Sequence, residues 1–318
     1  MDSFGWRPAV DVLTCGIQCD IAVWIAPVFQ RIGIIVKRGD KRVTGTLERL
    51  VAFLKARSVD LLMESDSAQV LPRLGIANTD RATLGRTCGL VIVIGGDGTF
   101  LSAARSLVDY EVPLLGINVA RLGFLTDINP KELAERLGEI LEGKFQEEWR
   151  FLLTTAILRE GKPVVEATAL NDIVVHKWEI ARLIEFNTYV DSHLVYRQRS
   201  DGLIVSTPTG STAYALAGGG PILHPSLDAI VLVPICPHTL TNRPLVVDGQ
   251  SRIEIVMGNA EHAEAQLTCD GQTTLELMPC DRVVIERKER RLHMVHPPGY
   301  DYYATLRAKL GWNSETQQ

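Results

Sequence analysis

Residues 90–100 read Leu90-Val91-Ile92-Val93-Ile94-Gly95-Gly96-Asp97-Gly98-Thr99-Phe100. The first five residues form a continuous apolar run, which is typical of a strand buried on both faces. The glycines that follow let the backbone approach a ligand closely, because no Cβ atom stands in the way. A helix that begins here presents unpaired N–H groups and a positive dipole end. The pattern therefore predicts a phosphate-binding loop, made by Gly95, Gly96, Gly98 and Thr99.

A carboxylate inside an anion-binding loop needs a chemical reason, and Asp97 stands at that position. It can hold a divalent metal that neutralises phosphates, or it can accept a proton from an attacking hydroxyl. The structural alternative is that Asp97 caps the helix, although capping does not require glycine on both sides. The motif lacks the third glycine of a dehydrogenase fingerprint, and no Gly-Lys pair precedes Ser or Thr as in a Walker A loop. The loop indicates a kinase of a different lineage.

The neighbouring sequence alternates between strand and helix patterns. Apolar runs at Ile32–Val36 and Pro113–Ile117 predict buried strands, and apolar residues at helical spacing occupy Thr44–Leu54 and Leu101–Val108. This alternation predicts a parallel sheet covered by helices.

After residue 130 the pattern changes. One helix is expected at Asn129–Glu142, and β-type segments dominate from Phe151 onward, with hairpin tips at Gly161-Lys162 and Asp191-Ser192. We expect Glu286–Arg291 to be a solvated hairpin turn. The predicted fold is an N-terminal α/β domain with a parallel sheet, then a mostly antiparallel, β-sandwich-like domain. A C-terminal helix over Tyr302–Leu310 is expected to return to the first domain. The expected division is an irregular extension at 1–30, an α/β domain at 31–129 plus 297–318, and a β-rich domain at 130–296.

Composition excludes several classes of protein. The 318 residues carry a net charge of -5 and no long basic run, which argues against a nucleic-acid groove. The apolar stretch Ile21–Phe29 is too short to span a bilayer and follows no basic segment, so neither a membrane span nor a signal peptide is expected. Six cysteines without zinc spacing fit a reducing cytoplasm.

Two more segments carry polar groups that suit a nucleotide. Residues 200–214 lead from a strand into a loop of small hydroxylated residues that ends at Tyr214, and a Ser/Thr-rich surface turn is the alternative. Asn171-Asp172 precedes a buried strand and can offer an amide and a carboxylate to a nucleoside. Asn-Asp is also a common turn pair, so this second signal stays open.

Taken together, these motifs stand in the order found in NAD kinases, and the chain resembles the Gram-negative bacterial branch of that family over residues 31–313. The motifs that carry the resemblance are Gly95–Thr99, Leu122–Asp127, Asn171-Asp172, Asp201-Gly202, Thr207–Tyr214, Pro221–Pro225, Arg243–Leu245, Cys269–Gln272 and Lys309–Trp312. Two departures are residues 1–30, which have no recognised counterpart, and Ala120, which stands where the family usually has glycine.

The resemblance implies transfer of the γ-phosphoryl group of ATP to the 2′-hydroxyl of the adenosine ribose of NAD. It implies Asp97 as the proton acceptor, Gly98 beside the nucleotide, and Asn171 with Asp172 at the adenosine part of NAD. Further contacts are implied for Arg182, Arg199, Asp201, Gln272 and the run Thr212, Ala213, Tyr214, Ala215, Leu216 and Ala217. It also implies Mg²⁺ or another divalent metal, brought with ATP, for which Asp97 is the candidate ligand, and a homodimer or homotetramer.

Two rival functions predict different sequences. A lipid kinase with the same loop would show a membrane-facing apolar surface. A non-catalytic NAD(P) sensor would have an altered Asp97 or an interrupted hydroxyl-rich loop. The sequence shows none of these features. The resemblance also associates Arg199 with ATP rather than polyphosphate as the donor, since a guanidinium can grip a phosphate in one pose. The alternative is that Arg199 pairs with a neighbouring carboxylate at the surface.

Overall fold

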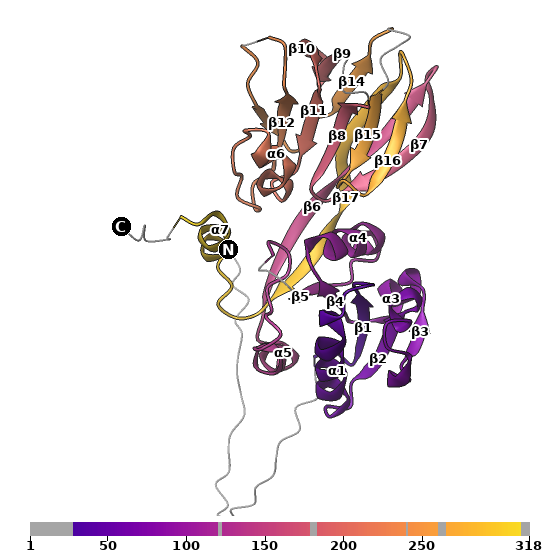
Figure 1. Ribbon diagram of the computed structural model, residues 1–318, viewed down its shortest axis with the longest axis vertical. Helices are drawn as coiled ribbons and strands as arrows, with labels where there is room; N and C mark the ends of the chain where they lie inside the picture. The colour runs from indigo at the N-terminus through magenta and orange to yellow at the C-terminus, as the bar shows by residue number, and fades with distance from the viewer. Residues whose placement is uncertain (1–27, 120–122, 179–182, 240, 260–264, 313–318) are drawn as a thin grey trace, which may run out of the picture.

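The computed structural model describes residues 28–119, 123–178, 183–239, 241–259 and 265–312 (Figure 1). The first domain holds five parallel strands in the order β5-β4-β1-β2-β3. They are β1 (Arg31–Val36), β2 (Asp60–Glu64), β3 (Ala77–Thr79), β4 (Leu90–Gly95) and β5 (Leu114–Asn118). The predicted parallel sheet is confirmed. Its central strands are apolar throughout because both of their faces are covered.

Helices cover the two faces of this sheet. On one face α1 (Arg42–Lys55) and α5 (Leu133–Leu141) pack against alternate residues of β1 and β4. On the other face α3 (Arg81–Thr87) and α4 (Asp97–Leu107) pack against the remaining ones. The strand order reverses between β1 and β4. The chain adds β2 and β3 on one side of β1 and then crosses over to add β4 and β5 on the other side of β1. In open α/β sheets, ligands bind beside the carboxyl ends of the strands at such a reversal.

The second domain is a sandwich of two antiparallel sheets. One sheet has the order β13-β12-β11-β8-β15-β16, and the other continues the sheet of the first domain through β17, β14, β9 and β10, with β6 and β7 beside β17. The inner faces of both sheets share one apolar core. The strands are β6 (Gln146–Arg159), β7 (Lys162–Ala169), β8 (Asp172–Lys177), β9 (Ile184–Val190), β10 (His193–Ser200), β11 (Gly202–Ser206), β12 (Ala229–Ile235), β13 (Leu245–Asp248), β14 (Ile253–Met257), β15 (Ala265–Cys269), β16 (Thr273–Leu277) and β17 (Arg282–His296).

Two long strands join the domains. β6 and β17 pair with each other along most of their length and run from the sandwich down to the α/β sheet, where Met294 of β17 pairs with Leu114 of β5 (Figure 1). The prediction of a hairpin turn at Glu286–Arg291 is therefore wrong. These residues lie inside β17, with a register shift between Arg287 and Arg291. Their charges have partners: Lys288 pairs with Asp109 and Arg290 with Glu111.

The hairpin tip predicted at Asp191-Ser192 is confirmed, with left-handed backbone at both residues. The tip predicted at Gly161-Lys162 lies one residue earlier, at Glu160-Gly161, because Lys162 already pairs with Arg159 as the first residue of β7. The expected domain limits differ from the packing at two places. Helix α5 buries Leu133, Leu137 and Ile140 in the core of the first domain, so a limit at residue 130 separates it from the layer it covers. Phe29 lies in the same core, although the expected extension includes it. Residues 1–27 and Ala120 lie outside the described residues.

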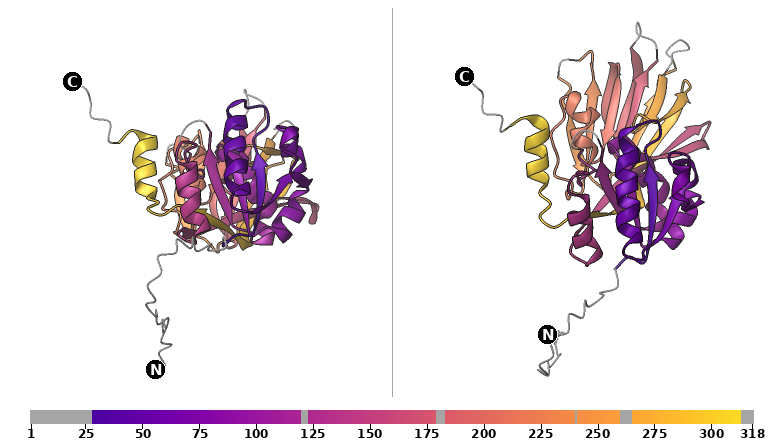
Figure 2. Two further views of the ribbon diagram at one scale, coloured as in Figure 1. Left: turned by 90° about the horizontal axis from the view of Figure 1, so that it is seen from below. Right: turned by 60° about the horizontal axis from the view of Figure 1, so that its bottom comes forward.

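The C-terminal helix α7 (Tyr302–Leu310) is present as predicted and lies at the outer side of the molecule (Figure 1, Figure 2). Its contacts reach both domains, since Lys309 lies over the ring of Phe124 and Tyr302 packs edge-on against His224. The short elements are α2 (Ser65–Ala68), α6 (Tyr214–Ala217) and the 3₁₀ turns Pro72–Leu74, Val108–Tyr110 and Gly210–Thr212. Among the described helices, none has the length and apolar character needed to cross a bilayer.

Candidate active site

The glycine-rich loop begins where β4 ends, at the reversal of strand order. A Cβ atom on Gly95 would lie 2.6 Å from the Thr99 hydroxyl, whereas one on Gly96 would meet nothing within 4 Å. Gly95 is thus required by packing, and Gly96 leaves open space beside the backbone. Helix α4 starts at Asp97, so the N–H groups of its first turn point toward that space.

The Asp97 carboxylate holds a second segment rather than capping its own helix. It accepts hydrogen bonds from the backbone N–H groups of Phe124 (3.0 Å) and Leu125 (3.1 Å) and from the Thr126 hydroxyl (3.4 Å). The cap of α4 is Gly96, with no side-chain hydrogen bond. A Cβ atom on Gly123 would lie 2.1 Å from Asp97 Oδ1, so glycine is required there. The structural alternative of a helix cap is therefore absent, and Asp97 faces the segment 123–126.

A cavity of about 370 Å³ opens at the reversal point, beside the loop. Lys37 and Arg38 line it from the end of β1, and Gly96, Gly98 and Thr99 from the start of α4. Both basic side chains are half-exposed or more, and their nearest carboxylates lie 3.6 Å away. Glu64, Asp66 and Arg81 line the cavity as well, so three cations face two carboxylates there. This excess of positive charge and the N–H groups of the helix meet in one cavity, which is an arrangement that can bind phosphate.

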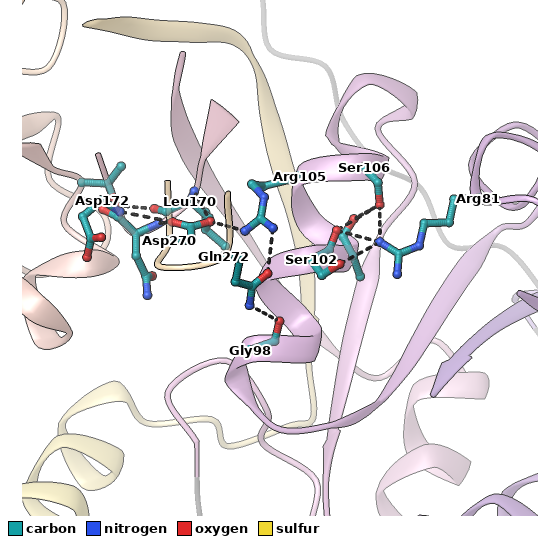
Figure 3. A network of polar contacts seen from close by, with 12 residues as sticks. Arg81, Gly98, Ser102, Arg105, Ser106, Leu170, Asp172, Asp270 and Gln272 are labelled. Atoms are coloured by element: carbon teal, nitrogen blue, oxygen red, sulfur yellow. Dashed lines mark hydrogen bonds and ion pairs between the residues drawn. The ribbon is translucent and has the colours of Figure 1, made fainter. Parts of the chain in front are cut away.

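Arg81 stiffens the wall of this cavity. Its Nε pairs with Glu64 at 2.5 Å, and its Nη1 donates to the backbone oxygen of Ser102 (2.9 Å) and to the hydroxyls of Ser102 and Ser106 (3.0 Å each). These contacts tie α3 to α4 (Figure 3). Arg81 is largely committed within the protein, so Lys37 and Arg38 are the more available cations.

A second network joins α4 to the sandwich domain (Figure 3). The Asp270 carboxylate, fully buried, pairs with Arg105 at 2.6 Å and accepts the backbone N–H groups of Leu170, Asn171 and Asp172. Gln272 accepts from Arg105 (2.7 Å) and donates to the backbone oxygen of Gly98 (2.8 Å). The structure thus brings Gln272 and the 170–172 turn to the glycine loop.

Arg105 and Asp270 are functional residues that sequence reasoning missed. Asp270 belongs to the quoted motif Cys269–Gln272, and its left-handed backbone at the tip of the β15–β16 hairpin marks it as a turn residue. Nothing in the sequence joins it to Arg105, because 165 residues separate the two.

Asp172 lies 4% exposed next to this network. Burial raises the pKa of its carboxyl group, and the negative charge of Asp270 raises it further. A hydrogen bond from the backbone of Tyr214 lowers it in part, and the resulting pKa is about 7. A carboxyl group whose pKa is raised in this way by burial and a neighbouring charge is a common feature of functional sites.

The hydroxyl-rich loop packs directly on the 170–172 turn. The Thr207 hydroxyl donates to the backbone oxygen of Leu170 (2.6 Å), and the Thr207 N–H donates to that of Asn171 (2.9 Å). A Cβ atom on Gly210 would lie 2.1 Å from the Asn171 oxygen, so this contact requires glycine. The following run, Thr212–Ala217, is half-exposed, with Tyr214 outward and Ala215 inward in a small apolar core.

Two predicted site residues lie elsewhere. Arg199 is 66% exposed and pairs with Glu185 on the adjacent strand at 2.9 Å, as in the surface alternative. Asp201 pairs with Lys177 at 2.6 Å. Strand β8 runs from Asp172 to Lys177, so Asp201 lies about 17 Å from Asp172 at the usual rise per residue. Arg182 lies outside the described residues.

No cluster of three His, Cys, Asp or Glu side chains that could hold a metal occurs in the described ranges. Mg²⁺, however, seldom needs such a cluster, since it usually keeps several waters and is held by one or two carboxylates plus the substrate phosphates. Asp97 at the mouth of an anion-binding loop fits that donor set.

Comparison with known proteins gives a consistent result. Residues 32–145 match the ATP-NAD kinase N-terminal domain, and residues 170–297 match the ATP-NAD kinase C-terminal domain. The chain is 50% identical over 286 residues to an NAD kinase of Chromohalobacter salexigens, covering 90% of this chain and 98% of that one, and 49% identical over 286 residues to an NAD kinase of Azotobacter vinelandii (90% and 97%). The structure is similar to yeast NADH kinase complexed with NADH (TM-score 0.83, 25% identity, 92% and 90% covered). It is also similar to an NAD kinase from Archaeoglobus fulgidus in complex with ATP (0.65, 26%, 88% and 97%).

Proposed function

Because the chain belongs to the ATP-NAD kinase family, we propose that Asp97 is the proton acceptor in its phosphorylation of NAD by ATP. The enzyme transfers the γ-phosphoryl group of ATP to the 2′-hydroxyl of the adenosine ribose of NAD and releases NADP and ADP. The observation that supports the role of Asp97 is its position as the carboxylate of an anion-binding loop, between Gly96 and Gly98, which line the cavity. The backbone N–H groups of Phe124 and Leu125 hold the carboxylate in place.

ATP is assigned to the cavity at the reversal of strand order. Its phosphates would meet Lys37, Arg38 and the N–H groups at the start of α4. NAD is assigned to the opposite side of the glycine loop. There Asn171 and Asp172 bind the adenosine part and Tyr214 lies beside it. The 2′-hydroxyl and the γ-phosphorus would then meet near Asp97.

The reaction is an in-line displacement. The 2′-oxygen forms a bond to the γ-phosphorus while the bond from that phosphorus to the β,γ-bridging oxygen breaks, and the bridging oxygen leaves with ADP. Asp97 holds the hydroxyl in line and takes its proton late, as the new bond forms, because a carboxylate is a weak base toward an alcohol. Such transfers depend mainly on positioning and charge neutralisation. A divalent ion, proposed to be Mg²⁺, supplies neutralisation of the triphosphate when bound.

We assign the protein to the cytoplasm, where both substrates occur and thiols stay reduced. We also propose a homodimer or homotetramer in which Arg199 and Asp201 reach the site of a neighbouring subunit. The separation of Asp201 from Asp172, about 17 Å along β8, and the exposed position of Arg199 support this arrangement.

The function is tested by incubating purified protein with NAD, ATP and Mg²⁺ and measuring NADP and ADP by chromatography. Equal amounts of the two products are expected, and none after chelation of the divalent ion. Binding of NAD without NADP formation would favour the sensor, and activity with a lipid acceptor instead of NAD would favour the lipid kinase.

The shared site is tested by mixing two inactive variants, Asp97→Asn and Asp201→Asn, and letting their subunits exchange. If Asp201 acts across an interface, a mixed oligomer contains some sites with both carboxylates, and activity returns. Either variant alone stays inactive. Mixtures without recovered activity, under conditions where exchange is demonstrated, would place Asp201 in its own subunit's site or outside the site.

A further inference from the structure

A buried cluster of four charges lies where the two domains meet, outside the ligand contacts described above. At its centre is His296, the last residue of β17, which is 1% exposed. Its Nδ1 lies 2.5 Å from Asp127 Oδ2, and its Nε2 lies 3.0 Å from Glu148 Oε2. Both carboxylates accept hydrogen bonds, so both ring nitrogens donate. Only the charged imidazolium can do so.

The charges of this cluster balance. Arg150, also buried, donates to Glu148 at 2.7 Å, which gives two positive and two negative groups. Burial alone would lower the pKa of His296, but the hydrogen bonds to Asp127 and Glu148 outweigh it and raise that pKa. Burial alone would raise the pKa of Glu148, but the hydrogen bond from His296 and the charge of Arg150 lower it to about 2.

The charged cluster contacts two parts of the candidate active site: the segment that holds Asp97 and the hydroxyl-rich loop. On one side, Asp127 belongs to the segment 123–128, whose backbone N–H groups hold the Asp97 carboxylate. On the other side, Arg150 donates to the Thr209 hydroxyl at 3.1 Å, within the hydroxyl-rich loop. A continuous series of polar contacts therefore leads from Asp97 through His296 to the opposite wall of the site.

We propose that His296 is a positioning residue: it fixes the segment that holds Asp97 relative to the hydroxyl-rich loop, and so aligns the two substrates. This inference rests on the proposed role of Asp97. Removing the imidazolium leaves two buried carboxylates facing one another with a single cation, Arg150. The segment 123–128 then shifts away from β6, and misplacement by about 1 Å can reduce catalysis as much as 10²-fold.

The first test compares His296→Asn with His293→Asn. Asparagine at 296 can keep one donor, toward Asp127, and loses the second. His293 is a matched control. It lies on the same strand with the opposite orientation, its Nε2 is 2.9 Å from Glu147, and its ring stacks on Trp149. We expect kcat of the first variant to fall roughly 10- to 100-fold with little change in either KM. The control should stay within about twofold, as for most substitutions away from a site.

The second test separates positioning from folding through the pH profile of kcat at saturating substrates. The imidazolium is present below its raised pKa and lost above it, so wild-type kcat should decline as pH rises through that value. Glu148→Gln removes one of the carboxylates that stabilise the charge, so the decline should move to lower pH. Asp127, Arg150 and the stacked Tyr300 ring remain around His296 in that variant.

The results test the kinase reaction and the role of His296 separately. Formation of NADP by the wild-type protein establishes the reaction, whatever the variants do. A folded His296→Asn protein with kcat within about twofold of wild type, or a pH profile that Glu148→Gln leaves unshifted, would overturn the role of His296. Loss of thermal stability without loss of kcat would reduce it to a structural role and overturn the proposal as well.

Discussion

The Asp270 carboxylate is the point at which a single change should affect stability and catalysis together. Its four hydrogen-bonded neighbours are Arg105 and the N–H groups of residues 170–172. Asp270→Asn replaces one accepting oxygen with a donating amide and leaves the partly buried Arg105 without its counter-charge, although its hydrogen bond to Gln272 remains. Breaking a buried ion pair in this way costs about 3–5 kcal/mol. Relief of the repulsion between Asp270 and Asp172 offsets part of this, so we expect a loss of roughly 3 kcal/mol.

The same variant should also be kinetically impaired, because Arg105 and the 170–172 turn position Gln272 and Asp172 beside the glycine loop. We expect kcat/KM for NAD to fall roughly 10- to 100-fold. Removing the charge of Asp270 should also lower the pKa of Asp172 from about 7, since that charge is one cause of its elevation. The measurements are urea unfolding and steady-state kinetics across pH.

A matched control is available in Asp281, which is also buried and paired through two hydrogen bonds with an arginine, Arg159. It precedes β17 at the end far from the first domain. Asp281→Asn should lose stability on a similar scale without an effect on kcat/KM beyond about twofold. The reasoning is refuted if Asp270→Asn is destabilised but keeps wild-type kcat/KM, or if both variants lose activity equally.

Three further predictions concern Asp97, Asp172 and the N-terminal residues. Asp97→Asn should bind NAD in a calorimetric titration while kcat falls at least ~10²-fold, and near-normal turnover would exclude Asp97 as proton acceptor. Ionisation of the buried Asp172 opposes folding, so its contribution to the free energy of unfolding should fall as pH rises from about 4 to about 7. In urea unfolding, Asp172→Asn should therefore be more stable than wild type by up to about 4 kcal/mol at pH 8 and equal to it near pH 4. Equal stability of the two proteins at both pH values would contradict the raised pKa of Asp172. Deleting residues 1–27 should leave the kinase activity unchanged, and a deletion variant that folds but is inactive would show that these residues contribute to the site. Phe29→Ala should lower the free energy of unfolding by about 3–5 kcal/mol, because the Phe29 ring packs against Phe145 in the core of the first domain.

The parts of the fold that were predictable are those that local pattern determines. β1, β4 and β5 are apolar except for Arg31 at the start of β1 and Asn118 at the end of β5, because helices cover both faces. The glycine loop directly follows β4. β17 was predicted as two strands because its middle is charged. Two partners of those charges, Asp109 and Glu111, lie in the other domain, and no local rule could supply them.

The candidate site was predictable where its residues carry their own signal, as Asp97 does between two glycines. Arg105 lacked one, since an arginine on a helix is usually solvated and only the fold brings it to Asp270. The resemblance implies ligand contacts for Arg199, Asp201 and Asn171 alike. Asp201, however, lies at the end of the β8–β11 pair opposite to Asn171, and Arg199 lies on β10 in the other sheet. A family resemblance implies which residues contact the ligand, but it does not specify the subunit to which each of them belongs.

The shared β6–β17 ladder has a mechanical consequence. Hinged enzymes connect their lobes by a few flexible residues, so that closing the cleft breaks few bonds. Here the connection is a two-stranded ladder that runs from the pair Gln146–His296 to the pair Leu158–Arg282, with one register shift between Arg287 and Arg291. Rotation of one lobe against the other would have to break or shear that ladder. Access for the substrates is therefore expected to come from twisting of the ladder and from movement of surface loops, and the amide protons along the ladder should exchange with solvent among the slowest in the molecule.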